Sequence, residues 1–427
     1  MDKIVHITPH MGGGVGNVIC GLMNSDIKNK HRVVLLEEPI ELKHIYKVNE
    51  YEKKFFICPN RSLLHQILTW SDIVIVHWWH HPLTSYFLYE LPKMPLRVVI
   101  WSHISNLTIP VLDARYILEA TSVFFTTESS YDSMPYQKID DRILFEKTAV
   151  VPGTIGFEDS LIVEKKTHPC FNIGYLGYID FSKLHSEFVE FCDEVKVNNV
   201  KFVMGGEAPV RKILEEQAIQ KGIADKFEYK GYIKNGYEFY STIDVLGYPL
   251  MPNHTCTTEN SILEAMISEI PPVLINQLVE KKIVTNGENG FLVSNKIEYG
   301  QAIKILHDNV ERRIDMGKKA RSSVLRKYGR QRILCNFQDQ CEKVMKTFPK
   351  IFDFSKILGK TPDKWFLSGI GEEKKMWELN DIRKCADILK GESKASIKQY
   401  TKYFNKNKQL VIWEKLVSDL KDKTGED

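Results

Sequence analysis

A glycine-rich segment follows the first apolar run of the chain. Residues His10–Asn17 read HMGGGVGN and stand between Lys3–Thr8 and a stretch with helical spacing. Glycines let a ligand approach the backbone, and a helix N-terminus offers N–H groups and the positive end of a dipole. The segment therefore predicts a ligand-binding loop, with a plain tight turn as the alternative. A dinucleotide site is a further alternative, because Glu37 and Glu38 follow the second apolar run, but Asn17 stands where G-x-G-x-x-G needs its third glycine.

Two carboxylates begin a later segment with helical spacing. Glu259 and Glu264 lie in the run ENSILEAM, which precedes the apolar run Pro272–Ile275. Ile262 and Met266 give this segment an apolar face, which leaves the carboxylates to point into a cleft. A carboxylate pair can accept hydrogen bonds from neighbouring hydroxyls of a ribose or another sugar. The alternative is that both residues only stabilise the helix dipole.

An aromatic cluster lies where another apolar run ends. The sequence HWWHHP begins at His77. On a strand, His77 and His81 would share a face and His80 would point away, and the sequence shows no further ligands at a metal-binding spacing. We therefore predict no metal here. Instead, Trp78, Trp79 and His80 are predicted to line a sugar-binding surface, with core packing as the alternative.

Short runs of β-branched and apolar residues recur along the chain and are separated by segments long enough for helices. Such near-continuous apolar runs are typical of parallel strands covered on both faces. The first series is Lys3–Thr8, Arg32–Leu36, Asp72–His77, Arg97–Trp101, Ser122–Thr126 and Thr148–Val151. The second series is Phe171–Leu176, Lys201–Met204, Lys226–Tyr229, Asp244–Tyr248 and Pro272–Ile275.

A polar, strandless stretch, Phe157–Pro169, separates the two series. The pattern predicts an α/β protein with two doubly wound sheets in succession. Residues 304–348 have a charged helical pattern, with helices expected over Glu311–Tyr328 and Arg330–Met345. The expected domains are 1–160, 161–330, a crossover helix over 331–348 that returns to the first domain, and a helical appendage over 349–427.

Composition indicates an ordinary globular protein of 427 residues, 43% hydrophobic and 26% charged. With 58 basic and 55 acidic side chains, the net charge of +3 gives no overall nucleic-acid signature. The cysteines form no C-x-x-C pair and are expected to be reduced thiols. No leader peptide and no membrane-spanning run is evident, so the expected location is the cytoplasm.

In order and spacing, the motifs resemble those of the retaining GT-B-fold glycosyltransferases of family 4, also described as glycosyl transferases group 1. The resemblance covers roughly residues 1–345. It is carried by the Gly12–Gly16 loop, Trp101–His103, Val151–Gly153, Gly174–Gly177 with Lys183, Val203–Gly206, Lys230–Tyr232, Leu263–Met266 and Val284–Val293. It implies two Rossmann-like domains facing a cleft: an acceptor-side N-terminal domain and a nucleotide-sugar-binding C-terminal domain.

The resemblance also implies roles for individual residues. Glu264 matches the second glutamate of the family's E-x7-E motif, which holds the donor ribose, and Lys183 matches the cation beside the donor diphosphate. His103 matches the histidine beside the transferred sugar. The expected catalytic residues are therefore His103, Lys183 and Glu259. The expected donor-binding residues are Gly13, Gly14, Val15, Gly177, Lys183, Gly231, Tyr232, Thr257, Thr258, Glu259, Asn260 and Glu264, with Trp78, Trp79 and His80 on the acceptor side.

The sequence departs from the family pattern at two positions. Cys256 stands where the first glutamate of E-x7-E would fall, and Glu259 is the candidate to replace it. The arginine usual before the matching lysine is absent, because Tyr178–Asp180 follow Gly177. Both departures leave the donor sugar and the phosphate charge balance open.

Beyond Phe348 the chain carries three tryptophans and many lysines. Five lysines (390, 394, 398, 402 and 406) recur every four residues and would form a wide basic band on a helix. A solvated face is the ordinary interpretation. The alternative is contact with anionic lipid head groups at the inner membrane face, or with a polyanionic acceptor.

The sequence thus predicts a hexosyltransferase that moves a sugar, with retention, from a nucleotide diphosphate sugar to a hydroxyl of a glycan, lipid-linked or protein-linked acceptor. No D-x-D motif occurs, so no metal or other cofactor is expected, and no nucleic-acid partner. Three alternatives remain: a nucleotide-sugar epimerase or hydrolase on the same fold, a NAD-dependent oxidoreductase, and a non-catalytic GT-B partner subunit.

Overall fold

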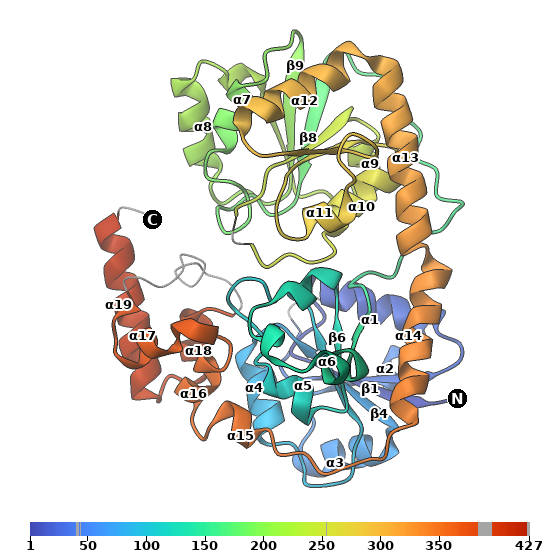
Figure 1. The fold of residues 1–427 in the computed structure, drawn as a ribbon, viewed down its shortest axis with the longest axis vertical. Coiled ribbons are helices and arrows are strands. Elements are labelled where there is room, and N and C mark those ends of the chain that lie inside the picture. Colours follow the sequence, from blue (N-terminus) through green and yellow to red (C-terminus); the bar gives the residue numbers. More distant parts are fainter. Residues whose placement is uncertain (40–41, 43, 253, 383–394, 425–427) are drawn as a thin grey trace. The chain divides into compact units, whose positions relative to one another are not determined.

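The chain folds into two compact units. The computed structural model describes residues 1–39, 42, 44–252, 254–382 and 395–424 (Figure 1). Unit 1 comprises Met1–Ile155, Thr255–Thr257 and Ile333–Asp427, and unit 2 comprises Gly156–His254 and Thr258–Arg332. The domain boundaries expected from the sequence lie at residues 160 and 330. In the structure, the chain passes between the two units after Ile155 and after Arg332.

Unit 1 contains a seven-stranded sheet in the order β3-β2-β1-β4-β5-β6-β7. Its strands are β1 (Lys3–Thr8), β2 (Lys30–Leu35), β3 (Phe55–Ile57), β4 (Ile73–Trp78), β5 (Val98–Ser102), β6 (Ser122–Phe125) and β7 (Thr148–Val150). All neighbouring strands are parallel. The strand order reverses direction between β1 and β4. In doubly wound sheets, ligands bind beyond the carboxyl ends of the strands at such a point.

Helices cover both faces of this sheet (Figure 1). The helices that precede the long excursion into unit 2 are α1 (Gly13–Ser25), α2 (Tyr51–Lys54), α3 (Arg61–Trp70), α4 (Pro82–Tyr89), α5 (Arg115–Glu119) and α6 (Asp141–Lys147). The chain returns through α14 (Arg330–Met345), whose Phe337, Cys341 and Val344 are buried against Ile4 of β1 and Val18 of α1. The apolar face of α14 therefore closes one side of the unit 1 core.

The C-terminal tail packs onto unit 1 beside α4. Its helices are α15 (Ser355–Leu358), α16 (Pro362–Leu367), α17 (Lys374–Glu378), α18 (Ile397–Tyr403) and α19 (Lys408–Thr424), drawn in orange to red in Figure 1. Trp365, Trp377 and Trp413 are at most 4% exposed and belong to the same apolar core as Trp78 and Phe87. The tail is thus a structural part of unit 1.

The five tail lysines do not form a band on one helix. Lys398 and Lys402 are exposed on α18, but this helix ends at Tyr403, so Lys406 lies outside it. Lys390 and Lys394 lie outside the described residues. The continuous basic helix that the spacing suggested is therefore wrong at its C-terminal end, because the chain turns after Tyr403 to begin α19.

Unit 2 contains a six-stranded parallel sheet in the order β10-β9-β8-β11-β12-β13. Its strands are β8 (Phe171–Leu176), β9 (Val200–Gly205), β10 (Phe227–Gly231), β11 (Val245–Tyr248), β12 (Pro272–Ile275) and β13 (Phe291–Val293). Its helices are α7 (Phe188–Asp193), α8 (Arg211–Gln220), α9 (Gly236–Tyr240), α10 (Asn260–Ile267), α11 (Glu280–Ile283), α12 (Lys296–Asp308) and α13 (Val310–Tyr328). The reversal of strand order falls between β8 and β11.

Every apolar run named from the sequence is a strand in the structure. The sequence missed β3 and β13, which span only three residues each at the edge of a sheet. A run of that length carries almost no periodicity of its own. Among the described residues, no helix is long and apolar enough to cross a membrane, and the seven described cysteines form no disulfide bond with one another.

Candidate functional site

Three loops meet at the carboxyl end of the unit 2 sheet. The Gly177 N–H donates to the Gly205 carbonyl at 3.0 Å, and the Gly206 N–H donates to the Gly231 carbonyl at 2.7 Å. Gly206 has φ +128°, and a Cβ atom there would lie 1.9 Å from the Gly177 oxygen. Only glycine fits this approach. The loops after β8, β9 and β10 are therefore tied together along one edge of the sheet.

An ion pair spans the point where the strand order of unit 2 reverses. Lys183 follows β8, and Glu259 caps α10 after β11. The Lys183 Nζ lies 2.9 Å from Glu259 Oε2, with the side chains 22% and 11% exposed. The Tyr248 hydroxyl donates to the same carboxylate at 3.3 Å, and the ammonium lies 5.5 Å from the Tyr248 ring centroid. The two residues predicted to be catalytic in this unit are thus in direct contact.

The backbone of Glu259 is held in an uncommon conformation. Its φ of 40° and ψ of 78° lie in the left-handed region, which costs a non-glycine residue about 1–3 kcal/mol. The residue begins α10 without a side-chain cap, and its carboxylate turns to Lys183 instead. Such strain persists only where the surroundings impose it, and it is common at binding sites.

Glu264 lies one turn further along α10 and faces α9. The Tyr240 hydroxyl lies 3.4 Å from Glu264 Oε2, and a Cβ atom on Gly236 would lie 3.1 Å from the same oxygen. Burial raises the pKa of Glu264 to about 7, the Tyr240 hydrogen bond lowers it, and the charge of Glu259 raises it further. The two glutamates are therefore electrostatically coupled, and Glu264 holds its carboxylate charge weakly near neutral pH.

The other predicted donor-binding residues of unit 2 differ in exposure. Gly231, at φ +68°, and the 65% exposed Tyr232 lie at the end of β10. Thr258 is buried. The Asn260 Oδ1 is buried and has no hydrogen-bond partner within the described part of the chain. Thr257 and Cys256 group with unit 1 rather than with the site in unit 2.

In unit 1, the glycine-rich segment forms the turn between β1 and α1. Gly13 has φ +64° with open space where a Cβ atom would lie, and Gly13 and Gly14 are exposed at the first turn of α1, while Val15 is half-buried. Gly16 is packed against Met11, since a Cβ atom there would lie 1.8 Å from the Met11 oxygen. The strand–turn–helix arrangement expected for a ligand-binding loop is therefore present.

The aromatic cluster after β4 divides into buried and accessible members. Trp78 and His80 are 1% and 0% exposed, and His80 packs on Phe366 and Tyr400 of the tail. These two residues cannot line an acceptor surface, which corrects the prediction: their rings fill the core between β4 and the tail. Trp79 is half-buried and lies 5.5 Å from His10 and 6.5 Å from His103, between ring centroids.

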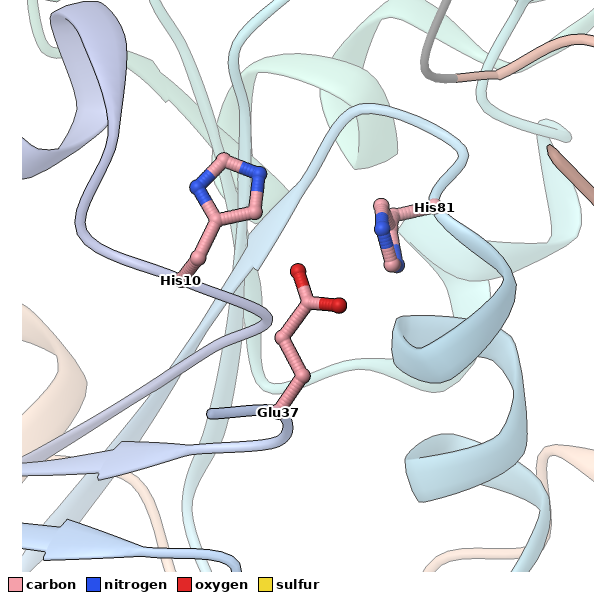
Figure 2. Close-up of side chains that lie close together, drawn as sticks. All are labelled: His10, Glu37 and His81. Carbon is pink, nitrogen blue, oxygen red and sulfur yellow. The ribbon is translucent and has the colours of Figure 1, made fainter. Parts of the chain in front are cut away.

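His10, Glu37 and His81 each offer one ligand atom, and these atoms lie within 4.8 Å of one another (Figure 2). They come from the loops after β1, β2 and β4, a convergence that their sequence spacing does not reveal. However, His10 Nδ1 accepts from the Gly12 N–H at 3.0 Å, and His81 Nδ1 accepts from the Leu83 N–H at 3.2 Å.

These backbone contacts decide the protonation of both rings. A neutral imidazole whose Nδ1 accepts a hydrogen bond carries its proton on Nε2, which then donates rather than ligates. Glu37 in turn accepts from the Tyr403 hydroxyl of the tail. Each member of the cluster therefore makes a hydrogen bond to a residue outside it, and the carboxylate of Glu37, which a dinucleotide site would use for a ribose, already accepts one from Tyr403.

His103 follows β5 at the same edge of the unit 1 sheet. Its ring stacks on Trp101 at 5.3 Å between centroids, and burial lowers its pKa to about 3. Its Nε2 lies 2.8 Å from His77 Nδ1. His103 is therefore a neutral imidazole with one nitrogen already committed to a hydrogen bond.

Sequence reasoning missed the tyrosines that support the carboxylates. Tyr248 and Tyr240 are fully buried, and their hydroxyls reach Glu259 and Glu264. Tyr248 stacks on Tyr175 with 4.6 Å between ring centroids. The available signal was a tyrosine at the last position of β11, where a side chain reaches the loop edge of the sheet.

Comparison with known proteins agrees with this architecture. Residues 163–323 match the family described as Glycosyl transferases group 1. A stretch of 121 residues, 28% of this chain, is 29% identical to 2-deoxystreptamine N-acetyl-D-glucosaminyltransferase of Niallia circulans. That stretch spans only 31% of the relative's length. Most of the region that is similar to glycosyl transferases group 1 therefore lies in unit 2.

Solved structures share the fold over about four fifths of the chain. HepE of Anabaena, in complex with UDP and glucose, has a TM-score of 0.61 at 13% identity and covers 80% of this chain and 100% of its own. TarM of S. aureus, in complex with fondaparinux, alpha-GlcNAc-glycerol and UDP, has a TM-score of 0.62 at 13% identity, with 81% and 100% covered. The lipopolysaccharide outer core galactosyltransferase WaaB has a TM-score of 0.57 at 14% identity, with 80% and 99% covered. The fold is GT-B, with two Rossmann-like units.

Proposed function

We propose that this protein is a glycosyltransferase that transfers a sugar from a nucleotide diphosphate sugar to an acceptor hydroxyl, with retention of anomeric configuration. The observation that carries the proposal is the set formed by Lys183, Glu259 and Glu264 at the point where the strand order of unit 2 reverses. Ligands of doubly wound folds bind at this place. The group 1 match over residues 163–323 supports the same assignment.

Each of the three side chains has a chemical task in this proposal. Glu264 accepts hydrogen bonds from the ribose hydroxyls, for which its charged form is the stronger acceptor. Lys183 stabilises the negative charge that grows on the diphosphate as the sugar departs. Glu259 holds the ammonium of Lys183 in place through the contact at 2.9 Å.

Retention and the absence of a metal requirement are further parts of the proposal. Retention rests on the resemblance to family 4. The proposal assigns phosphate stabilisation to Lys183 and to backbone N–H groups, since the sequence contains no D-x-D motif for a metal ion. The departing diphosphate then helps to deprotonate the acceptor hydroxyl.

A panel of ligands tests the donor assignment directly. Thermal shift and calorimetry would compare UDP, GDP, ADP, CMP and NAD, with UDP first because HepE and TarM were solved with it. We expect binding to one nucleoside diphosphate and not to NAD. Binding to NAD alone would support the oxidoreductase, and binding to none would support a non-catalytic partner subunit.

The Glu264→Ala variant then locates the site. Loss of a charge-assisted hydrogen bond to ribose should weaken nucleotide binding by about 1.5–3 kcal/mol. The Glu238→Ala variant is a matched control, because Glu238 is exposed on the neighbouring helix α9. Unchanged affinity in Glu264→Ala would place the ribose elsewhere, with Glu259 the next candidate.

We propose that the acceptor is a hydroxyl of a carbohydrate, lipid-linked or protein-linked molecule. We also propose that the protein works in the cytoplasm at or near an anionic membrane. Exposed Lys398 and Lys402 on α18 support the membrane contact. Neutralising the five tail lysines (390, 394, 398, 402 and 406) to Gln should weaken binding to anionic liposomes by up to ~1 kcal/mol per charge. No binding by the wild-type protein at low salt would end this part of the proposal.

A further inference from the structure

A continuous row of hydrogen-bonded imidazoles crosses unit 1 and ends at His103. His31 Nε2 lies 3.1 Å from Asp26 Oδ2, and His31 Nδ1 lies 2.9 Å from His6 Nε2. His6 Nδ1 lies 2.9 Å from His77 Nε2, and His77 Nδ1 lies 2.8 Å from His103 Nε2. His31, His6 and His77 thus each use both ring nitrogens in a single chain of contacts, and His103 uses one.

The sheet itself creates this row. His31, His6 and His77 lie on the adjacent strands β2, β1 and β4, and His103 directly follows the next strand, β5. Each of the three strand histidines is at most 7% exposed. Neighbouring strands are about 4.8 Å apart, which suits one imidazole between two others. Consecutive ring centroids are accordingly 5.0–5.2 Å apart.

Apolar rings close the row against water. Trp101 stacks on both His77 and His103, and Phe337 of α14 contacts His31 and Trp101. A buried polar nitrogen without a partner would cost about 1–3 kcal/mol. Here each strand histidine forms a hydrogen bond with the group on either side of it. The ring nitrogens along the row must therefore alternate as donors and acceptors.

Asp26 sets the direction of this alternation. Its carboxylate accepts from Asn29 Nδ2 at 2.9 Å, Gln338 Nε2 at 2.7 Å and the Lys28 N–H at 3.1 Å, in addition to His31. Burial raises the pKa of Asp26, but the hydrogen bonds from His31, Asn29 and Gln338 outweigh it, and the pKa falls to about 2. The carboxylate is therefore ionised and can only accept.

An ionised Asp26 has one consequence for every ring. A neutral His31 carries its proton on Nε2 towards Asp26, so its Nδ1 is an acceptor and needs the proton of His6 Nε2. The same reasoning places the proton of His77 on Nε2, and that of His103 on Nε2. Burial lowers the pKa of His6 and of His77 well below the usual value, which keeps both rings neutral.

We propose that Asp26, acting through His31, His6 and His77, fixes His103 as the Nε2–H tautomer, so that His103 offers Nδ1 as a hydrogen-bond acceptor for a sugar hydroxyl. The four remote residues are positioning residues and do not touch substrate. The tautomer follows from the hydrogen bonds together with a neutral His31, whereas the hydroxyl as ligand rests on the proposed function. In the opposite tautomer, His103 Nδ1 would carry a proton and donate a hydrogen bond, so it could not accept one from a sugar hydroxyl.

Nitrogen NMR of protein labelled with ¹⁵N-histidine measures this tautomer directly, because protonated and bare ring nitrogens give well-separated signals. His103→Gln and His77→Gln identify the signals by their loss. We expect a proton on Nε2 and a bare Nδ1 in wild-type His103. A proton on Nδ1 of wild-type His103 would overturn the proposal, whether or not any variant folds.

Asp26→Asn is the decisive variant, because it replaces an obligate acceptor with a group that can donate. We expect His103 in this variant to shift towards the Nδ1–H tautomer. His65→Gln removes an exposed histidine on α3 and should leave the His103 signals unchanged. An unchanged His103 tautomer in folded Asp26→Asn would show that Asp26 does not direct the row.

Binding distinguishes this proposal from the proposed function. The Asp26→Asn variant should bind the nucleotide sugar roughly tenfold more weakly, since a hydrogen bond to the sugar is lost. Its affinity for the nucleoside diphosphate should equal that of the wild type. Equal loss for both ligands would indicate a structural role and contradict the proposal. If the protein binds no nucleotide at all, the proposed function fails while the NMR result still decides the tautomer.

Discussion

Glu264 should lower the stability of unit 2 at neutral and alkaline pH. Its pKa rises from 4.5 to about 7, mainly because the carboxylate is buried beside α9. Below about pH 4, the folded and the unfolded chain both hold this proton. Between about pH 4 and 7 only the folded chain holds it, so stability falls as pH rises, and above pH 7 the loss is complete.

The size of the effect follows from the shift. A displacement from 4.5 to about 7 corresponds to an upper limit of about 3 kcal/mol at 1.36 kcal/mol per pKa unit. Glu264→Gln keeps the shape and can still accept from Tyr240, but it removes the titration. We therefore expect Glu264→Gln to gain stability relative to wild type as pH rises from 5 to 8, by up to that amount.

Thermal and denaturant unfolding at pH 5 and pH 8 measures this gain, with Glu238→Gln on α9 as the control. The same Glu264→Gln protein should bind the nucleotide more weakly, because a neutral amide is a poorer acceptor for ribose hydroxyls. Stability and binding are thus expected to change in opposite directions. A stability difference that is equal at both pH values would refute the reasoning, since it would mean that Glu264 titrates alike in the folded and unfolded chain.

Three further predictions concern the loops, the cation and the tail. Lys183→Ala should lower turnover by about 10²–10³ with a small change in melting temperature, and steady-state kinetics that show near wild-type turnover would remove Lys183 from the phosphate site. Gly206→Ala should destabilise unit 2 and weaken nucleotide binding together, as measured by melting and calorimetry, because its Cβ would meet the Gly177 oxygen at 1.9 Å; an unperturbed variant would show that the loops after β8 and β9 separate freely. Trp377→Ala should lower the stability of unit 1 by about 3–5 kcal/mol in denaturant unfolding, since this ring is 1% exposed in the core shared with α4. Nucleotide binding by unit 2 should stay intact. A variant as stable as the wild type would mean that the tail packs only loosely on unit 1.

The packing of the tail also changes what truncation would do. From the sequence alone, removal of residues after Phe348 is expected to spare donor binding and to affect only the acceptor or membrane. The structure places Trp365 and Trp413 in the unit 1 core, so truncation should destabilise unit 1 as well. A test of the tail's role in recruitment therefore needs the lysine variants and not the deletion.

Secondary structure and the order of the two sheets follow from the sequence alone. Runs such as Lys3–Thr8 and Phe171–Leu176 are rich in apolar and β-branched residues, and a strand buried on both faces accounts for that pattern. Glycines such as Gly206 and the glutamates that begin α10 were also visible, because their function depends on local backbone geometry. The edge strands β3 and β13 were too short for any pattern to show.

Which side chains meet depends on the tertiary structure. Parallel strands bring five residues into one row: Asp26, His31, His6, His77 and His103. Hydrogen-bonded pairs in this row are up to 71 residues apart in the sequence, and no spacing in the sequence encodes the row. In the same way, Trp78 and His80 look like a ligand surface in the sequence and are core in the structure, because the tail packs over them. Burial depends on residues hundreds of positions away, whereas strand and helix formation depends on near neighbours.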